Sequence, residues 1–535
     1  MRQNPFQEHE TKQLSPRRRS RRTASFLNAS AICCALALLP IPARSEPSSP
    51  VAALQDSTES VSKSVVKIFT TVRYPDFFKP WTKQSPVSLV GSGVVIEGKR
   101  ILSNAHVIQY ASQVQIQANE AGDKISGTVV GVSPEMDLAV IKLDDESFFD
   151  SHPPLRRGAE LPEIQDTVKV YGFPTGGSSM SITKGIVSRI EFASYTGAGT
   201  GLRIQVDAAI NSGNSGGPAM VGDNMIGLAY SVATQAQNIG YIIPCEEIEL
   251  FLTKMVDGQY HGRPLLREKH QPLQNSALRA YLHVDKSVHG VVVQQISPIP
   301  KNNPLQKWDI ITEIGDIPID DEGMVILRSK LRVSFTYLIN KMAREDRVPL
   351  TVIRDGKTLP LEVPVMSNPP YVMAGLNGSY PSYFVYGPLA FSQAAEDLIP
   401  VITSGRTASI FTKLLIAQGS PLFRRWGDSP AFDGEQLVFV TTLFPHKISR
   451  GYSDPITEVV KSVNGTTIKN LAHLVEVLRD AKDPFVTIEF CGKLSDTLVF
   501  KRDEILANTD EILSDNNVRS QGSPDMMAVW NEKKN

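Results

Sequence analysis

The chain has 535 residues, which is more than one hydrophobic core normally serves. At roughly 150 residues per domain, this length predicts about three or four structural units. Its residues are 41% hydrophobic, 21% charged and 7% aromatic, which excludes a wholly disordered or fibrous protein. The formal net charge is −1, but residues 1–45 hold eight basic and two acidic groups. The other 47 basic and 54 acidic groups make the body of the chain acidic, which argues against binding of nucleic acid.

Residues 1–45 have the order of a cleavable leader. Five arginines between Arg17 and Arg22 precede an apolar, small-residue run from Phe26 to Ala43, and Ala43-Arg44-Ser45 fits a small-x-small cleavage site. The alternative is a basic nuclear or nucleic-acid-binding arm, although such arms lack an adjoining apolar core. No later apolar run reaches the roughly 20 residues that cross a bilayer. We therefore expect a signal peptide, a periplasmic protein and no stable membrane span after processing.

The cysteines and histidines predict neither disulfides nor a metal. Cys245 and Cys491 remain after the leader and fall in different predicted domains, and no C-x-x-C pair occurs. Both are therefore read as buried thiols. His283 and His289 flank a short segment without a third ligand at suitable spacing, so they are read as non-ligands. We expect no cofactor and no metal.

Residues 46–60 are rich in Ser, Pro and Glu and read as a linker, and residues 61–258 follow as a β-rich domain. In that domain short β-like runs are broken by Gly, Pro, Asn and Asp, a pattern typical of an antiparallel barrel or sandwich. Near its end, Ile248, Phe251, Leu252 and Met255 recur at helical spacing and predict one closing amphipathic helix.

Two further segments, 277–366 and 380–505, each combine β-like runs with a helical pattern. In the second, Leu471, Leu474, Val475 and Leu478 predict the helix. Residues 511–535 are polar in part and are expected to form a poorly ordered tail.

Catalytic residue types gather in the β-rich domain. Ser215 lies in the glycine-rich stretch from Asn211 to Pro218, and a serine there needs a base to take its proton. His106 follows one β-like run, and Asp137 stands at the entry to another. The chain order is therefore His, Asp, Ser, which is the order of the chymotrypsin-like double barrel.

Three motifs in this order, followed by the two mixed segments, resemble the HtrA/Deg family of serine endoproteases. The motifs are Ser-Asn-Ala-His, Asp-Leu-Ala-Val and Gly-Asn-Ser-Gly-Gly-Pro. The flanks Gly172–Gly177 and Ile182–Arg189 are similar to the plant nuclear-type Deg branch and its bacterial relatives. The resemblance implies a mainly β fold: a chymotrypsin-like double β-barrel protease domain followed by two α+β PDZ-like domains.

The resemblance also implies the roles of individual residues. Ser215 would be the nucleophile, His106 the general base and Asp137 the group that orients it. The backbone amides of Gly213 and Ser215 would form the oxyanion hole. In trypsin-like enzymes a carboxylate six residues before the nucleophile selects basic side chains. Ala209 occupies that position in this sequence, which implies an apolar pocket for small or medium aliphatic residues. The residues expected to line it are Ala209, Ile210, Asn238, Ile239, Gly240, Tyr241 and Ile242.

In the first PDZ-like segment, the place of the carboxylate-binding loop falls on Tyr281, Leu282, His283 and Val284. His283 and Trp308 stand where the family usually has glycine, which puts carboxylate capture in doubt. The binding loop of the second segment is hard to place, so an assembly module is the preferred reading there.

The expected function is ATP-independent endoproteolysis of unfolded or damaged proteins, because no nucleotide-binding loop accompanies the triad. The alternative is a chaperone or scaffold on a protease fold with a latent triad. The family further implies a homo-oligomer, a trimer or a multiple of trimers. Its contacts could use the aromatic stretch Tyr74, Phe77, Phe78 and Trp81, unless these residues pack into their own barrel.

Overall fold

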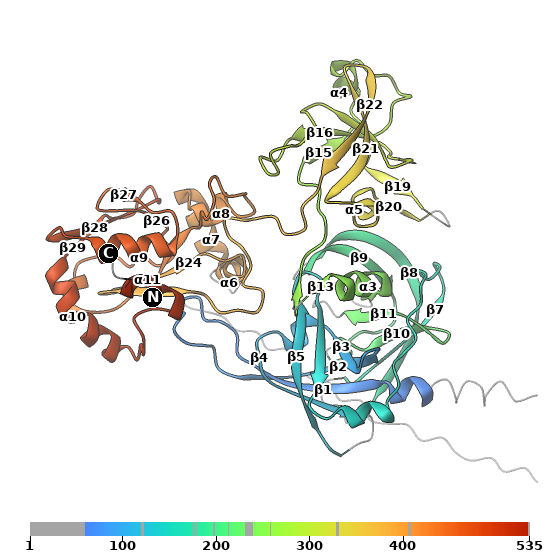
Figure 1. Ribbon diagram of the computed structural model, residues 1–535, viewed down its shortest axis with the longest axis horizontal. Helices are drawn as coiled ribbons and strands as arrows, with labels where there is room; N and C mark the ends of the chain where they lie inside the picture. The colour runs from blue at the N-terminus through green and yellow to red at the C-terminus, as the bar shows by residue number, and fades with distance from the viewer. Residues whose placement is uncertain are drawn as a thin grey trace, which may run out of the picture. The chain divides into compact units, whose positions relative to one another are not determined.

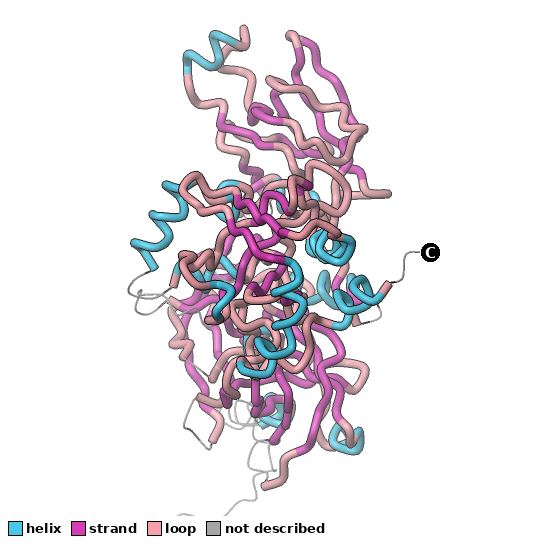
Figure 2. The backbone as a smooth tube through the Cα atoms, turned by 90° about the vertical axis from the view of Figure 1, so that its left-hand side faces the viewer, coloured by secondary structure: helices cyan, strands magenta, loops and turns pink. Residues whose placement is uncertain are grey.

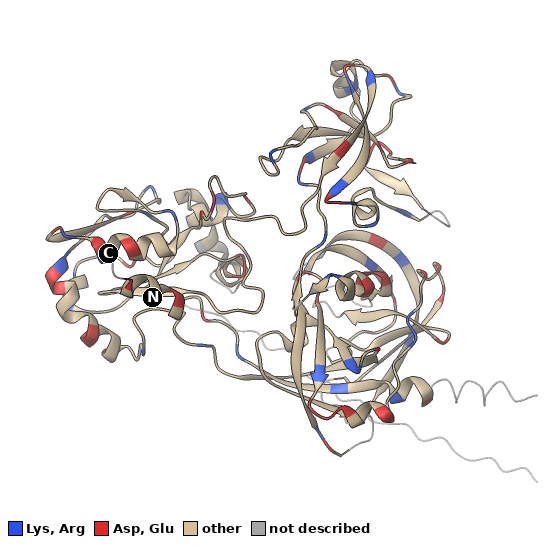
Figure 3. Cartoon of the chain, viewed as in Figure 1, with Lys and Arg blue, Asp and Glu red and all other residues tan. Residues whose placement is uncertain are grey.

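The computed structural model describes residues 59–118, 122–174, 177, 179–195, 198–211, 213–230, 239–256, 258–327, 331–404 and 408–532. Strands occur in every folded part of the chain, and most helices are short (Figure 2). The mainly β expectation is confirmed. Basic and acidic side chains are interspersed over both barrels (Figure 3).

The first barrel is built from strands whose side chains alternate between core and surface. In β1, Val66, Ile68, Thr70 and Val72 are buried and the residues between them are partly exposed, as period-2 alternation requires. The barrel closes because β5 pairs with both β4 and β6. Its strands are β1 (Val65–Val72), β2 (Val87–Ile96), β3 (Arg100–Ser103), β4 (Ala111–Ala118), β5 (Ile125–Ser133) and β6 (Leu138–Leu143). The turn helices are α2 (Ala105–Ile108) and η1 (Glu146–Asp150).

The second barrel is a closed ring of six antiparallel strands in the order β10-β11-β12-β9-β8-β7 (Figure 1). The hairpin β8–β9 is its longest pairing, with Ile190 opposite Ile204. Its strands are β7 (Thr167–Gly172), β8 (Ser181–Tyr195), β9 (Ala198–Val206), β10 (Pro218–Val221), β11 (Asn224–Tyr230) and β12 (Gly240–Pro244). The two rings confirm the double-barrel prediction.

Helix α3 (Cys245–Lys254) follows the second barrel and buries Ile248 and Phe251, as the helical spacing predicted. The chain then returns to the first barrel, since β13 (Met255–Val256) pairs with β14 (Gln259–Tyr260) and β14 pairs with β5. The first folded region therefore extends to Tyr260, past the expected boundary at residue 258.

A second folded region is built on the sheet β15-β16-β17-β21-β22. Because β15 begins at Lys269, this region starts before the expected residue 277. Its elements are β15 (Lys269–Pro272), α4 (Ser276–Tyr281), β16 (Val291–Gln295), β17 (Ile310–Ile314), β18 (Ile317–Pro318), β19 (Met324–Ile326), β20 (Arg332–Ser334), α5 (Thr336–Met342), β21 (Arg347–Arg354) and β22 (Lys357–Pro364).

The C-terminal region carries a three-stranded sheet, β23-β24-β25, and a four-stranded sheet, β27-β26-β28-β29. Helix α9 buries Leu471, Leu474, Val475 and Leu478, as predicted. The strands are β23 (Tyr383–Tyr386), β24 (Leu389–Gln393), β25 (Val438–Leu443), β26 (Val460–Val463), β27 (Thr466–Thr467), β28 (Phe485–Phe490) and β29 (Leu498–Lys501). The helices are α6 (Leu398–Thr403), α7 (Ala408–Gln418), α8 (Pro421–Arg424), η3 (Lys447–Ser449), α9 (Leu471–Asp480), α10 (Arg502–Asp515) and α11 (Pro524–Asn531).

Residues 511–532 are folded, contrary to the expected poorly ordered tail. Val385 donates its N–H to the carbonyl of Gln521 at 2.7 Å, so this segment extends the edge of β23. Helix α11 then places the ring of Trp530 5.1 Å from that of Phe384. The expectation gave too little weight to the apolar run from Met526 to Trp530, which forms most of α11.

The aromatic stretch of residues 74–81 packs within the chain. Phe77 is 4% exposed and belongs to an apolar cluster with Val372 and Leu398 of the C-terminal region. The ring of Trp81 lies 5.3 Å from that of Phe444. Phe77 and Trp81 thus pack on the C-terminal region, whereas the ring of Tyr74 lies 5.9 Å from that of Tyr110 beside the first barrel.

Both remaining cysteines are free thiols. Cys245 is buried, as predicted, and burial raises the pKa of its thiol to about 12. Cys491 is exposed, unlike the prediction. Among the described residues no helix is both long and apolar enough to span a bilayer.

Candidate active site

His106 and Asp137 meet because the strands that carry them are neighbours. His106 lies in the single-turn helix α2 directly after β3, and Asp137 immediately precedes β6. Strands β3 and β6 pair with Ser103 opposite Ala139. As a result, His106 Nδ1 lies 2.7 Å from Asp137 Oδ2, and Asp137 Oδ1 accepts the backbone N–H of His106 at 2.8 Å. One carboxylate thus holds both the ring and the backbone of the histidine.

Asp137 is held in an unusual and buried position. It is 3% exposed, and its φ of +55° lies in the left-handed region, which Asp tolerates better than most residues. The Asn104 side chain donates its Nδ2–H to the Asp137 carbonyl at 3.0 Å. This bond and those to His106 keep the carboxylate aimed at the imidazole.

The pKa of His106 is raised above its ordinary value of 6.5. Burial acts to lower this pKa, but the hydrogen bond and the negative charge of Asp137 outweigh it. The imidazole side chain is still 44% exposed, so its far side can meet a bound molecule. A raised pKa and an open face suit a group that accepts and returns a proton.

The loop that carries Ser215 depends on glycine. Gly213 has a φ of +101° and Gly216 a φ of +83°, and side-chain-bearing residues rarely adopt such values. A Cβ on Gly216 would lie 2.2 Å from the carbonyl oxygen of Ser92. The loop can therefore approach the first barrel only because glycine stands there.

Ser215 is placed at the seam between the two barrels, where His106 also lies. Its carbonyl accepts the N–H of Ser92 in β2 at 2.9 Å, which joins the loop to the first barrel. The next residue, Gly216, donates its N–H to the carbonyl of Ala229 at 3.0 Å. The ring of Tyr230, beside Ala229, lies 6.2 Å from the ring of His106. The three predicted triad residues are thus brought to one region.

Tyr230 forms part of the wall of this region. Burial, and second to it the charge of Asp137, raise the pKa of Tyr230 to about 12, while Arg203 acts to lower it. The guanidinium of Arg203 lies 5.8 Å from the Tyr230 ring. Tyr230 therefore stays neutral and presents an aromatic surface to the imidazole.

The residues expected to line a substrate pocket lie next to the nucleophile loop. Ala209 is exposed, and Ile210 packs over Gly240, since a Cβ on Gly240 would lie 2.7 Å from Ile210 Cδ1. Ile239 is 38% exposed, whereas Ile242 points into the core. Tyr241 pairs with Gln205 of β9. Asn238 lies outside the described residues.

The residues expected to form a carboxylate-binding loop lie at the end of a helix. Tyr281 is the last residue of α4, and Leu282, His283 and Val284 follow it directly. Tyr281 is 63% exposed, and its ring lies 5.4 Å from that of Trp308. His283 and Trp308 have φ values of +55° and +79°, which explains why glycine suits both positions.

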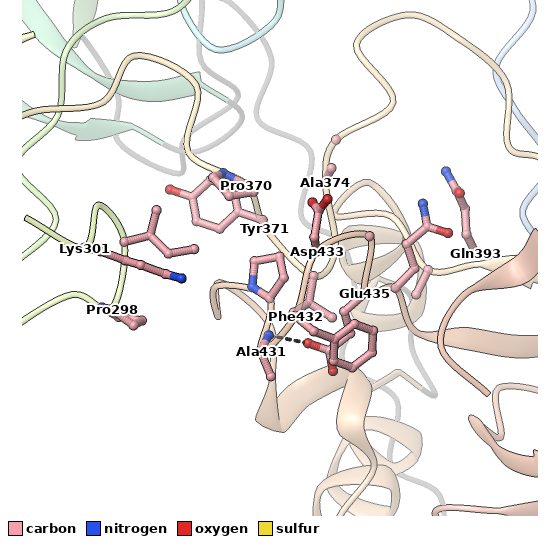
Figure 4. Close-up of a pocket in the computed structure, with 17 residues that line it drawn as sticks. Pro298, Lys301, Pro370, Tyr371, Ala374, Gln393, Ala431, Phe432, Asp433 and Glu435 are labelled. Carbon is pink, nitrogen blue, oxygen red and sulfur yellow. Dashed lines mark hydrogen bonds between the residues drawn. The ribbon is translucent and has the colours of Figure 1, made fainter. Parts of the chain in front are cut away.

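A pocket of about 620 Å³ lies elsewhere in the chain (Figure 4). Segments 298–301, 370–375 and 430–436 line it, with Tyr371 and Phe432 among its aromatic residues. No predicted triad or oxyanion residue borders it. Within the described parts of the chain, no group of three or more His, Cys, Asp or Glu side chains could hold a metal ion.

Three site residues escaped the sequence patterns: Ser92, Asn104 and Tyr230. Asn104 was visible only as part of a motif, and nothing local indicated that it holds the Asp137 carbonyl. Tyr230 lies at the end of a buried strand, where an aromatic residue reads as core. Ser92 stands between two glycines, which was the available signal that two backbones approach there closely.

Two closed barrels, with a His–Asp pair and a glycine-dependent serine loop at their seam, define a trypsin-like serine peptidase. The family model for a trypsin-like peptidase domain matches residues 91–228, and the model for a PDZ domain matches residues 374–525. The chain thus joins a serine peptidase domain to a PDZ domain.

Two Arabidopsis thaliana proteins are among the relatives that this chain resembles in sequence. "Protease Do-like 4, mitochondrial" is 36% identical over 425 residues, covering 79% of this chain and 78% of the relative. "Protease Do-like 2, chloroplastic" is 33% identical over 477 residues, covering 88% and 76%. The solved structure described as "HtrA-type protease AlgW with decapeptide" has a TM-score of 0.46 and 23% identity, covering 59% of this chain and 99% of its own.

This chain belongs to the HtrA/Deg family of Do-like serine proteases. The similarity to plant relatives agrees with the branch that the sequence motifs indicated. The names of these two relatives place them in mitochondria and chloroplasts and not in a periplasm.

Proposed function

We propose that the protein is an ATP-independent serine endopeptidase that cleaves unfolded or damaged proteins through an acyl-enzyme. The observation that carries this proposal is the 2.7 Å contact between His106 Nδ1 and Asp137 Oδ2 beside the buried loop of Ser215. Because Nδ1 is engaged by Asp137, Nε2 is the imidazole nitrogen that can accept the proton of the serine hydroxyl.

In the proposed reaction, Ser215 Oγ attacks the carbonyl carbon of a peptide bond while His106 Nε2 takes the hydroxyl proton. His106 then returns that proton to the amine nitrogen as the C–N bond breaks, which leaves an ester on Ser215. Water attacks the ester, again with His106 as base, and the acid product leaves. Asp137 keeps Nδ1 protonated and stabilises the imidazolium between these steps.

The N–H groups of Gly213 and Ser215 are the proposed donors to the developing oxyanion. The φ of +101° at Gly213 supports this role, because a turn open mainly to glycine is needed to aim that N–H away from the loop. A single such donor contributes about 3 kcal/mol to lowering the barrier.

The proposed primary pocket is shallow and apolar. Ala209 carries no charge, and Ile210 occupies the space above Gly240, so a long basic side chain would find neither room nor a counter-charge. We propose cleavage after small or medium aliphatic residues, with Ala209, Ile210 and the 238–242 segment as the selecting residues.

Hydrolysis of casein by the wild type and by Ser215→Ala, each with and without ATP, tests this function. We expect ATP-independent turnover by the wild type and a loss of at least about 10⁴-fold in the variant. Equal activity of both would instead favour the second candidate, a scaffold on a protease fold.

We also propose that the chain assembles as a homotrimer or a multiple of trimers. Phe77 and Trp81 pack within the chain, which favours a contact surface other than the aromatic stretch. We further propose a carboxylate-binding loop at the end of α4, formed by Tyr281, Leu282, His283 and Val284. The molar mass from light scattering tests the assembly.

We propose that residues 1–45 are a targeting leader that is removed on export to the periplasm. The leader lies outside the described residues, and the organelle names of the relatives supply a rival destination. A basic, Arg-rich leader suits either route, although an uninterrupted apolar run is the mark of a secretory signal. N-terminal sequencing of the mature protein, together with fractionation, tests both the cleavage and the compartment.

A further inference from the structure

Ser92, in the middle of β2, is hydrogen-bonded to several segments that border the candidate active site. Its hydroxyl donates to the carbonyl of Gly213 at 2.7 Å and accepts the backbone N–H of Phe173 at 2.8 Å. Its own N–H donates to the carbonyl of Ser215 at 2.9 Å, and its carbonyl accepts the Ser103 hydroxyl at 2.7 Å. One serine of the first barrel is therefore tied to the nucleophile loop, to the end of β7 and to the end of β3.

The bond to Gly213 acts on a particular peptide group. The Gly213–Asn214 peptide lies between the amide of Gly213 and the amide of Ser215. Its carbonyl is held by Ser92, and its N–H donates to the carbonyl of Asn211 at 3.0 Å. A peptide plane held at both ends cannot turn without breaking a hydrogen bond. If it did turn, the two flanking amides would no longer point to a common position.

No other group can easily replace the Ser92 hydroxyl. Ser92 is 0% exposed and Phe173 is 1% exposed. A Cβ on Gly172 would lie 3.0 Å from Ser92 Oγ and 2.9 Å from Asn214 Cα, so the surroundings are tightly packed. A water molecule needs more space than this packing leaves. Without the hydroxyl, the Gly213 carbonyl and the Phe173 N–H would both lose a buried hydrogen bond.

We propose that Ser92 is a positioning residue for the oxyanion hole. Its hydroxyl holds the Gly213–Asn214 peptide so that the amides of Gly213 and Ser215 converge on the oxygen of the tetrahedral intermediate. Ser92 acts through the loop and does not itself touch the substrate. The inference rests on the proposed function of Ser215 as nucleophile.

The test is Ser92→Ala, with kinetics on a peptide substrate and binding of a peptide boronate that places an oxygen in the hole. We expect kcat to fall roughly 10- to 100-fold, since both donors lose their aim but remain present. The affinity for the boronate should fall by a similar factor, whereas KM should stay near the wild-type value. The midpoint of the pH profile of kcat/KM should not move, because the His106–Asp137 pair is intact.

Two further variants separate positioning from a general loss of packing. Ser64→Ala removes a hydroxyl from another buried serine of the first barrel, 1% exposed, whose bond goes to the Pro153 carbonyl. It should keep the wild-type kcat and boronate affinity. Ser92→Thr retains a hydroxyl and should recover at least part of the activity that Ser92→Ala loses. Thermal unfolding of each variant checks that it is folded at the temperature of the kinetic measurements.

A folded Ser92→Ala protein with wild-type kcat and boronate affinity would overturn the proposal. A rise in KM without a loss of boronate affinity, or a displaced pH midpoint, would assign Ser92 to a different role and overturn it equally. Failure of the underlying peptidase function would be recognised separately, as equal activity of the wild type and Ser215→Ala.

Discussion

Asp137 combines a sparsely populated backbone conformation with two hydrogen bonds to His106. Left-handed backbone at a residue other than glycine costs free energy and persists only where the surroundings impose it. Here the Asn104 side chain and the pairing of β3 with β6 impose it. The conformation allows Oδ1 to reach the backbone of His106 while Oδ2 reaches its ring.

The pH dependence of activity follows from the His106 pKa, which lies above 6.5. In the proposed mechanism His106 must be neutral to accept the serine proton, so a raised pKa moves the acid limb of kcat/KM to a midpoint above pH 6.5. In Asp137→Asn the charge that raises the pKa is gone and burial, which lowers it, remains. We expect kcat to fall on the order of 10⁴-fold and the midpoint to fall below that of the wild type.

The pH profiles of kcat/KM for the wild type and Asp137→Asn check this prediction. An acid midpoint that is the same in both proteins would show that Asp137 does not set the pKa of the base. Glu135→Gln is a useful control: this carboxylate, two residues from Asp137, pairs with Arg263 and does not contribute to the raised pKa of His106, so the midpoint should stay in place.

Glu247 of helix α3 is a buried carboxylate that pairs with Arg263 and also bonds to the backbone of strand β9. Arg263 is 1% exposed and Glu247 is 4% exposed, and Arg263 Nη2 lies 2.7 Å from Glu247 Oε2. Glu247 Oε1 also accepts the backbone N–H of Leu202 in β9 at 2.7 Å. The carboxylate therefore connects the helix, the second barrel and the segment that leaves the protease domain.

Removal of one charge from this pair should be costly. Arg263→Leu leaves Glu247 buried without its counter-charge, and we expect the free energy of unfolding to fall by about 3–5 kcal/mol. Adding Glu247→Gln should recover part of this loss, because the side chain at position 247 is then no longer a buried charge without its partner. Urea unfolding measures both. Lys142→Gln, which breaks the exposed pair with Glu146, is the control and should cost less than about 1 kcal/mol.

An Arg263→Leu protein as stable as the control variant would contradict the importance of this pair.

At the scale of the whole molecule, segments far apart in the chain complete one another's cores. Phe77, between β1 and β2, lies in the same apolar cluster as Leu398 and Phe439. The Thr442 hydroxyl donates to the carbonyl of Phe78 at 2.5 Å, and Tyr380 donates to the carbonyl of Arg73 at 2.8 Å. The protease domain and the C-terminal region are therefore linked by apolar and polar contacts together.

The double variant Phe77→Ala/Trp81→Ala should loosen this link. We expect the C-terminal region to be released faster in limited proteolysis, because the substitutions open cavities at both ends of the contact. The molar mass measured by light scattering should stay that of the wild type, since the aromatic side chains are already engaged within the chain. A shift of the assembly to monomers would show instead that these rings hold subunits together.

Local patterns predicted many of the elements correctly. The helical spacing of Ile248 and Phe251 correctly predicted α3, and that of Leu471 and Leu474 correctly predicted α9. A helix that buries one face has apolar residues every three or four positions, so the sequence pattern alone reveals it. The tail was misjudged because Val385 and Gln521 pair across a separation that no local pattern reports. Ser92 was missed for the same reason, since its partners Phe173 and Gly213 are distant in the chain.

The sequence by itself determined the residue types and their order: His106, Asp137 and Ser215 on separate β-like segments, with glycines where the backbone must turn or approach closely. These follow from local chemistry, that is, from side-chain identity and allowed φ and ψ. Only the tertiary structure decided that Asp137 Oδ2 reaches His106, that Ser92 holds the Gly213 carbonyl, and that Phe77 is buried by the C-terminal region. Each of these depends on strand pairing and packing between distant segments, and a hydrogen bond exists only when both partners are brought within about 3 Å.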